Sequence, residues 1–139
     1  MERKFKVLKI DHIAVAVDNV NNSKSLFELL GMNCNDIENV KNENVNVIKI
    51  HAESRENSIE LLEPTDDSSS VKLFLDKKGH GLHHIALEVD DIYNAIDYLQ
   101  ENNVKIIYNT PQKGADNKLI TFIHPHSTPG ILIELCQLA

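Results

Sequence analysis

The chain has 139 residues, 42% of them hydrophobic, and a formal net charge of −7 at pH 7. This length suits one domain or two small intertwined halves, and the apolar fraction is enough for a buried core. An acidic chain is a poor ligand for nucleic acid, because phosphate binding needs clustered lysines and arginines. No apolar run approaches the roughly 18 residues of a membrane span. With no signal-peptide pattern and two widely spaced cysteines, Cys34 and Cys136, we expect a cytoplasmic protein without nucleic-acid or membrane partners.

The first predicted element is a strand over residues 5–17. Its alternation places His12, Ala14 and Ala16 on one face. The two alanines leave room beside the imidazole, while isoleucine and valine on the opposite face can pack under a helix. Taken alone, such a histidine is more often a satisfied core residue than a ligand.

The rest of the first half predicts short elements separated by polar turns. A helix is expected over 20–30 before Gly31, a short strand around 33–39, strands at 45–50 and 58–62, and one or two helical turns at 71–77. Within the strand at 45–50, Asn46 and Lys49 break the alternation unevenly.

The stretch at residues 81–92 repeats the sequence around His12 without a gap. His84 lies 72 residues after His12, and each histidine is followed by Ile-Ala. Such an internal repeat indicates a duplicated architecture. Strand parity places His84 on the same face as His12, whereas His83 points to the opposite face and is expected to serve structure or the sheet rim.

The elements after this repeat parallel those of the first half. We expect an amphipathic helix beginning at Ile92, a strand at 104–108, a loop at 110–117, and strands at 118–123 and 130–135 separated by a turn at 124–129. The last strand contains Ile-Glu-Leu around Glu134, as the strand at 58–62 does around Glu60. Each half therefore offers one histidine on its first strand and one glutamate on its last.

Buried carboxylates in apolar strands are costly unless they are paired, protonated or bound to a cation. If the two halves pack about a pseudo-twofold axis, His12, Glu60, His84 and Glu134 converge on one cleft. Two imidazoles and two carboxylates suit a divalent Co, Mn, Ni, Fe or Zn ion and leave two octahedral positions open. The competing interpretation is a pair of buried His-Glu hydrogen bonds without metal.

At these residues the chain resembles the vicinal-oxygen-chelate superfamily and, within it, the methylmalonyl-CoA epimerase family. The motifs that carry the resemblance are residues 10–14, 60–64, 78–86, 89–92, 122–125 and 130–135. The resemblance implies an α+β fold like that of glyoxalases and bleomycin-resistance proteins, in which two tandem βαβββ modules form a curved mixed sheet around a metal-binding cleft. We expect a single domain over 1–139, with modules at about 7–64 and 81–137 and a linker at about 65–80.

The resemblance also implies a reaction, namely interconversion of (R)- and (S)-methylmalonyl-CoA by proton abstraction at C2 through a metal-stabilised enolate. It places the metal ligands at His12, Glu60, His84 and Glu134, with Co²⁺ as the expected ion and Mn²⁺, Ni²⁺ or Zn²⁺ as alternatives. It assigns proton transfer to Glu134. For a second base, Glu60 and Glu43 remain open, because the strand at 45–50 contains no glutamate. An acyl-CoA substrate and a homodimer are implied as well.

Two other functions remain open at this stage. A glyoxalase I-type lactoylglutathione lyase would use the same ligand set on a thiol-methylglyoxal hemithioacetal. A non-catalytic module would bind a small molecule without turnover. The turn at 124–127 reads His-Pro-His-Ser, where relatives usually have His-Pro-Lys-Ser, so one plausible phosphate contact for CoA is absent.

Overall fold

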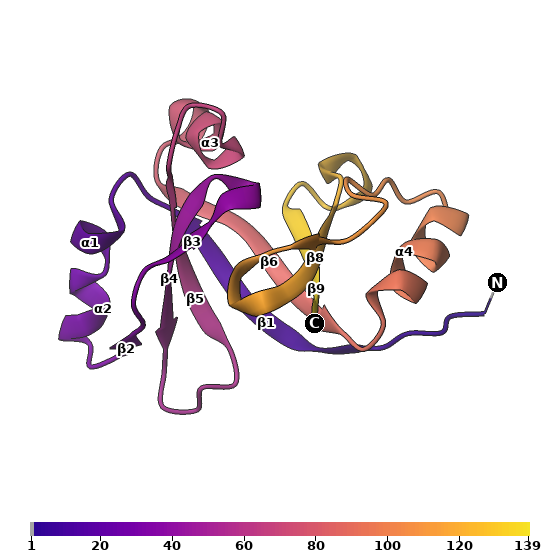
Figure 1. The fold of residues 1–139 in the computed structure, drawn as a ribbon, viewed down its shortest axis with the longest axis horizontal. Coiled ribbons are helices and arrows are strands. Elements are labelled where there is room, and N and C mark those ends of the chain that lie inside the picture. The colour runs from indigo at the N-terminus through magenta and orange to yellow at the C-terminus, as the bar shows by residue number, and fades with distance from the viewer. Residues whose placement is uncertain (1) are drawn as a thin grey trace. The chain divides into compact units, whose positions relative to one another are not determined.

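The computed structural model describes residues 2–139. Within this range no helix is long and apolar enough to cross a membrane. Contacts divide the chain into two compact units. We call residues 12–83 the first unit, and residues 2–11 with 84–139 the second unit (Figure 1).

The first unit contains the strand, helix and strand pattern predicted for the first module. Its elements are β1 (Val7–Ala16, whose residues 12–16 belong here), α1 (Val20–Ser23), α2 (Ser25–Leu29), β2 (Asn33–Cys34), β3 (Glu38–Val40), the 3-10 helix η1 (Lys41–Glu43), β4 (Val45–His51), β5 (Ser58–Pro64) and α3 (Ser70–Lys78). The strand order is β2-β4-β5-β1, with β3 also paired to β4. β1 and β5 are parallel, and β4 is antiparallel to its neighbours.

The second unit repeats this pattern. Its further elements are β6 (Gly81–Val89, whose residues 84–89 belong here), α4 (Ile92–Glu101), β7 (Gln112–Lys113), the 3-10 helix η2 (Ala115–Asn117), β8 (Lys118–Ile123), the 3-10 helix η3 (Pro125–Ser127) and β9 (Leu132–Leu138). The strand order is β6-β9-β8-β7, with β6 and β9 parallel. Both units are therefore βαβββ modules, which confirms the predicted α+β class.

The helix predicted over 20–30 is divided into α1 and α2 at Lys24. Asn19 caps its start, because the side chain accepts a hydrogen bond from the amide of Asn22. The asparagines and serines on either side of Lys24 are weak helix formers, which favours an interruption of the helix there. Gly31 ends the second piece with a positive φ of 82°, as expected for a C-terminal glycine. Among the apolar residues of α2, Phe27 packs on the core, whereas Leu29 is 86% exposed.

The strand predicted at 104–108 does not form, and this prediction was wrong. The segment runs beside β8, and two backbone hydrogen bonds flank an isolated bridge between Ile106 and Ile123 without forming a regular strand. The amide of Tyr108 donates to the hydroxyl of Thr121, which in turn donates to the carbonyl of Tyr108. At Tyr108, the side chain of Thr121 therefore takes the place of a backbone partner. The extra strand of the module is instead β7, within the predicted loop at 110–117.

Each unit has its own apolar core. In the first unit Val17, Val20, Ile48, Ile50 and Leu61 form a buried cluster. In the second unit α4 buries Ile92, Ala95 and Ile96 against Val89, Ile106 and Leu135. This confirms the predicted apolar stripe of the helix, whose start Asp91 caps through the amide of Asn94.

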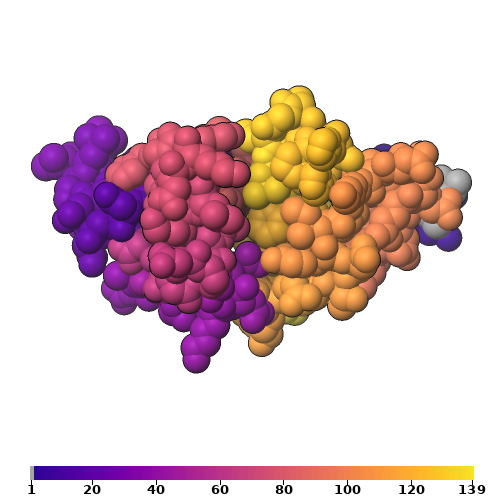
Figure 2. Space-filling view, turned by 90° about the horizontal axis from the view of Figure 1, so that it is seen from above, coloured from indigo at the N-terminus to yellow at the C-terminus, as the bar shows by residue number. Residues whose placement is uncertain are grey.

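Helix α3 lies on the surface of the first unit and faces the viewer in Figure 2. Ser69 caps its start by accepting a hydrogen bond from the amide of Val71, and Gly79 follows its end at a φ of 75°. The ring of Phe74 contacts that of His83 edge-on at 5.2 Å between centroids. His83 is thus engaged by the helix, which agrees with the structural role expected for it.

Candidate functional site

The first unit brings His12 and Glu60 together. His12 lies on β1 and Glu60 on the parallel strand β5. The imidazole Nδ1 lies 3.2 Å from Oε2 of Glu60, and both residues are about 4% exposed. We call this pair the first half-site.

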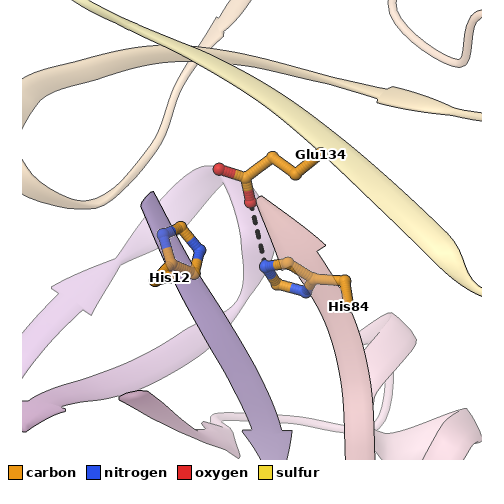
Figure 3. A group of neighbouring side chains, drawn as sticks. All are labelled: His12, His84 and Glu134. Carbon is orange, nitrogen blue, oxygen red and sulfur yellow. Dashed lines mark ion pairs between the residues drawn. The ribbon is translucent and has the colours of Figure 1, made fainter. Parts of the chain in front are cut away.

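The second unit brings His84 and Glu134 together in the same way. His84 lies on β6 and Glu134 on the parallel strand β9. Nε2 of the imidazole lies 3.0 Å from Oε1 of the carboxylate, and both residues are buried. Figure 3 shows this contact, with the imidazole directed at the carboxylate. We call this pair the second half-site.

An identical strand register builds the two half-sites. Ala14 lies opposite Glu60 in the β1–β5 pair, and Ala86 lies opposite Glu134 in the β6–β9 pair. Both alanines are fully buried. Because the alanine side chain is a single methyl group, it leaves space for the longer carboxylate side chain to reach the histidine two residues earlier. The sequence repeat is therefore also a repeat of strand register, although His12 approaches its glutamate through Nδ1 and His84 through Nε2.

The donor set fits a divalent metal ion. All four side chains are potential metal ligands, and all four are buried. An imidazole and a carboxylate in direct contact supply one nitrogen and one oxygen donor per half-site, and such donors suit borderline to hard divalent ions. Each contact also fits the competing interpretation, a buried His-Glu hydrogen bond without metal. The geometry within each unit is therefore compatible with a metal site and with a metal-free pair.

The two half-sites differ in the residue across from the glutamate. Lys49 on β4 lies opposite Glu60, and its Nζ is 3.8 Å from Oε2 of that carboxylate. The corresponding neighbour of Glu134 is Phe122 on β8, whose ring contacts the ring of His84 edge-on at 5.6 Å. Lys49 was not predicted as a site residue, although its interruption of the strand alternation was a signal.

A second buried ion pair, which was not predicted either, lies in the second unit. Nζ of Lys118 on β8 is 2.7 Å from Oδ1 of Asp11 on β1, and their side chains are 10% and 6% exposed. Burying two charges is tolerated here because each compensates the other at hydrogen-bond distance. The pair anchors the residue that immediately precedes His12.

Replacing Lys118 by Met is expected to lower the free energy of unfolding by about 3–5 kcal/mol, because the carboxylate of Asp11 loses a buried cation. Urea unfolding followed by circular dichroism measures this. Lys72→Met is the matched control, since Lys72 pairs with Asp76 on the exposed surface of α3 and its loss should cost less than about 0.5 kcal/mol. Equal effects of the two substitutions would contradict a buried ion pair.

The two cysteines are free thiols in different environments. Cys136 on β9 is fully buried, and burial, followed by the nearby Asp11 and Glu134 carboxylates, raises the pKa of its thiol. Cys34 is partly exposed, with a pKa raised mainly by burial and then by Glu28. Because the thiolate is the reactive form, both should react slowly.

We expect one thiol per chain, that of Cys34, to react with iodoacetamide at pH 8 in the folded protein. The thiol of Cys136 should react only after unfolding, since it is both buried and protonated. Peptide mass spectrometry at several times identifies the alkylated residue. Alkylation of Cys136 at the same rate as Cys34 would contradict its buried position.

An open groove of about 490 Å³ lies on the first unit, lined by Asp18, Pro64, Thr65, Asp66, Asp67, Lys72, Leu75, Asp76 and His80. Four of these residues are aspartates, and Nε2 of His80 is 3.2 Å from Oδ1 of Asp18. A groove rich in carboxylates disfavours a phosphate-bearing ligand by like-charge repulsion.

The turn at 124–127 carries two stacked imidazoles. The rings of His124 and His126 are 5.0 Å apart and nearly parallel, and Nδ1 of His124 accepts a hydrogen bond from the amide of His126. Partial burial, then Lys105 and His126, lower the pKa of His124. This lowered pKa disfavours a positive charge on His124.

Comparison with known proteins agrees with this architecture. The profile of the Glyoxalase/Bleomycin resistance protein/Dioxygenase superfamily matches residues 11–122. The uncharacterized protein YqjC of Bacillus subtilis is 39% identical over 93% of this chain and 91% of its own length. The mitochondrial methylmalonyl-CoA epimerase of Dictyostelium discoideum is 38% identical over 95% of this chain and 80% of its own length.

A solved structure is similar over the same extent. The methylmalonyl-CoA epimerase of Mycobacterium tuberculosis superposes with a TM-score of 0.92 and 30% sequence identity, and covers 100% of this chain and 93% of its own. The fold implied by the family resemblance is thus the fold of that enzyme. The chain belongs to the glyoxalase/bleomycin resistance protein/dioxygenase superfamily.

Proposed function

We propose that the protein is a metal-dependent epimerase that interconverts (R)- and (S)-methylmalonyl-CoA by proton transfer at C2. The observation that carries the proposal is the pair of buried His-Glu contacts at matching positions of the two repeats. The similarity to enzymes named methylmalonyl-CoA epimerase supports the choice of reaction and the acyl-CoA substrate.

The proposed metal ligands are His12, Glu60, His84 and Glu134, so the two half-sites together would hold one ion. Co²⁺ is the ion we propose first, with Mn²⁺, Ni²⁺ and Zn²⁺ as alternatives of the same donor preference. When bound, the ion supplies Lewis-acid stabilisation for the negative charge that develops on the substrate oxygens. These four side chains would hold the ion, and any coordination position that they leave unfilled would be open to those oxygens.

The proton is moved by the protein's own carboxylates. A hydrogen next to a thioester carbonyl is a weak acid, so its removal needs a base held at the correct position. We assign this task to Glu134, whose carboxylate is buried and oriented by His84. Inversion requires delivery of a proton to the opposite face of C2, for which Glu60 is the proposed second group.

Association and location remain proposals made from the sequence. We propose a homodimer acting in the cytoplasm. Size-exclusion chromatography with light scattering would give twice the chain mass of 15.7 kDa for the dimer.

The choice between epimerase and lyase is tested by offering both substrates to the metal-loaded protein. Incubation with (S)-methylmalonyl-CoA should yield both stereoisomers, separated by a stereospecific coupled assay. Methylglyoxal with glutathione, or with other thiols, should yield no S-lactoyl thioester. Formation of the thioester without epimerisation would replace the proposal by the glyoxalase I reaction, and stoichiometric binding without turnover would replace it by a binding function.

A further inference from the structure

Lys49 is a buried cation set directly against the first half-site. It lies on β4 opposite Glu60 and is 8% exposed. Its Nζ approaches Oε2 of Glu60 at 3.8 Å, and the Nδ1 of His12 approaches the same oxygen at 3.2 Å. A lysine is rarely buried to this extent without a charged partner.

The second half-site is built differently at the equivalent place. Phe122 occupies the position across from Glu134 that Lys49 occupies across from Glu60. Phe122 is 8% exposed and packs edge-on against His84. The two repeats therefore share their histidine, glutamate and alanine positions but differ in the charge beside the glutamate.

The difference has electrostatic consequences for the two glutamates. A cation close to a carboxylate favours its ionised form and offsets its charge, whereas an apolar neighbour disfavours the ionised form. Nζ of Lys49 therefore offsets the charge of the Glu60 carboxylate and helps to fix its orientation. At the equivalent place across from Glu134 lies the uncharged ring of Phe122.

We propose that Lys49 is a positioning residue that fixes the Glu60 carboxylate and compensates its negative charge in the first half-site. The part that concerns metal rests on the proposed function. With Lys49 present, Glu60 adds an oxygen donor but little net negative charge. The site then attracts a divalent ion less strongly than two histidines with two uncompensated carboxylates would.

The first test is carried out on the metal-free protein and needs no activity. Lys49→Met should lower the urea midpoint of unfolding, because the charge of Glu60 loses a buried cation. Adding Glu60→Gln to Lys49→Met should raise the urea midpoint most of the way back to the wild-type value, because the negative charge that had lost its partner is then removed. Lys49→Arg keeps the cation and should remain near the wild type, and the exposed Lys72→Met serves as the control. Strictly additive effects of Lys49→Met and Glu60→Gln would overturn the pairing.

The second test measures Co²⁺ affinity by competition with a chelator. Lys49→Met should bind Co²⁺ about tenfold or more tightly than the wild type, because a charge repelling the ion is lost. Lys49→Met/Glu60→Gln should return to within a few-fold of the wild type. Unchanged or weaker Co²⁺ binding by Lys49→Met would overturn the compensating role, since a lysine with only a packing role would not tighten binding when removed. If the wild type binds no Co²⁺, the proposed metal site fails, while the urea measurements still decide whether Lys49 and Glu60 act as a pair.

Discussion

Replacing Glu134 by Gln is expected to lower kcat for epimerisation by about 10²–10⁴-fold, the usual contribution of a positioned general base. Glutamine keeps the size of the side chain and one oxygen donor but cannot accept the proton from C2. The second half-site should remain folded, because an amide oxygen can still accept a hydrogen bond from His84. Steady-state rates of the metal-loaded variant, with circular dichroism to verify the fold, measure the effect.

Glu101→Gln is the control for this substitution. Glu101 lies at the end of α4 and is exposed, so its loss should leave kcat unchanged. Glu60→Gln provides a comparison within the site. If Glu60 acts mainly as a ligand, its replacement should reduce metal affinity more than kcat at saturating metal. A Glu134→Gln variant with wild-type kcat would remove Glu134 from the reaction.

The second large effect is expected from the histidines. Replacing either His12 or His84 by Ala should weaken Co²⁺ binding by at least about a hundredfold, since losing even an outer-shell partner of a ligand costs 10–100-fold. Both substitutions should abolish epimerisation at stoichiometric metal. The two effects should be similar in size, because the proposed ion is shared by the two half-sites. Isothermal titration of the metal-free proteins measures the affinities.

The matched control is His83→Ala. His83 precedes His84 in the same strand, but its ring packs against Phe74 of α3. Its removal should leave Co²⁺ affinity within a few-fold of the wild type, and the lost ring contact should lower stability slightly. Metal binding that survives His12→Ala while His84→Ala abolishes it would show that the half-sites do not share one ion.

Sequence periodicity was sufficient to predict which face of its strand each histidine occupies, because side chains alternate between the two faces of a strand. His12 and His84 were expected on faces lined by alanines, and Ala14 and Ala86 are indeed buried next to the glutamates. The repeat also pointed to Glu60 and Glu134, since they follow the histidines of their own halves at nearly equal separations, 60 − 12 = 48 and 134 − 84 = 50 residues. The contacts within each half-site follow from these positions once β1 pairs with β5 and β6 with β9.

Other features depended on strand register and on side chains that replace backbone hydrogen-bond partners. Periodicity in the sequence predicts neither. The Lys49–Glu60 contact needs the register of the β4–β5 hairpin, which depends on the conformation of the polar turn between the strands. The strand expected at 104–108 was replaced by irregular pairing because Thr121 bonds the backbone of Tyr108. The Asp11–Lys118 pair joins residues 107 positions apart, and no local pattern indicates such a partner.

The central claim is metal-dependent proton transfer at C2, and solvent deuterium exchange tests it most directly. Methylmalonyl-CoA is incubated in D₂O with metal-free protein and with the same protein after addition of one equivalent of Co²⁺, and the C2 hydrogen is followed by proton NMR. We predict loss of the C2 signal with the Co²⁺-loaded protein at a rate far above that of the metal-free protein, and its reversal by a chelator. Exchange that is absent with both proteins, or equally fast with both, would contradict the claim.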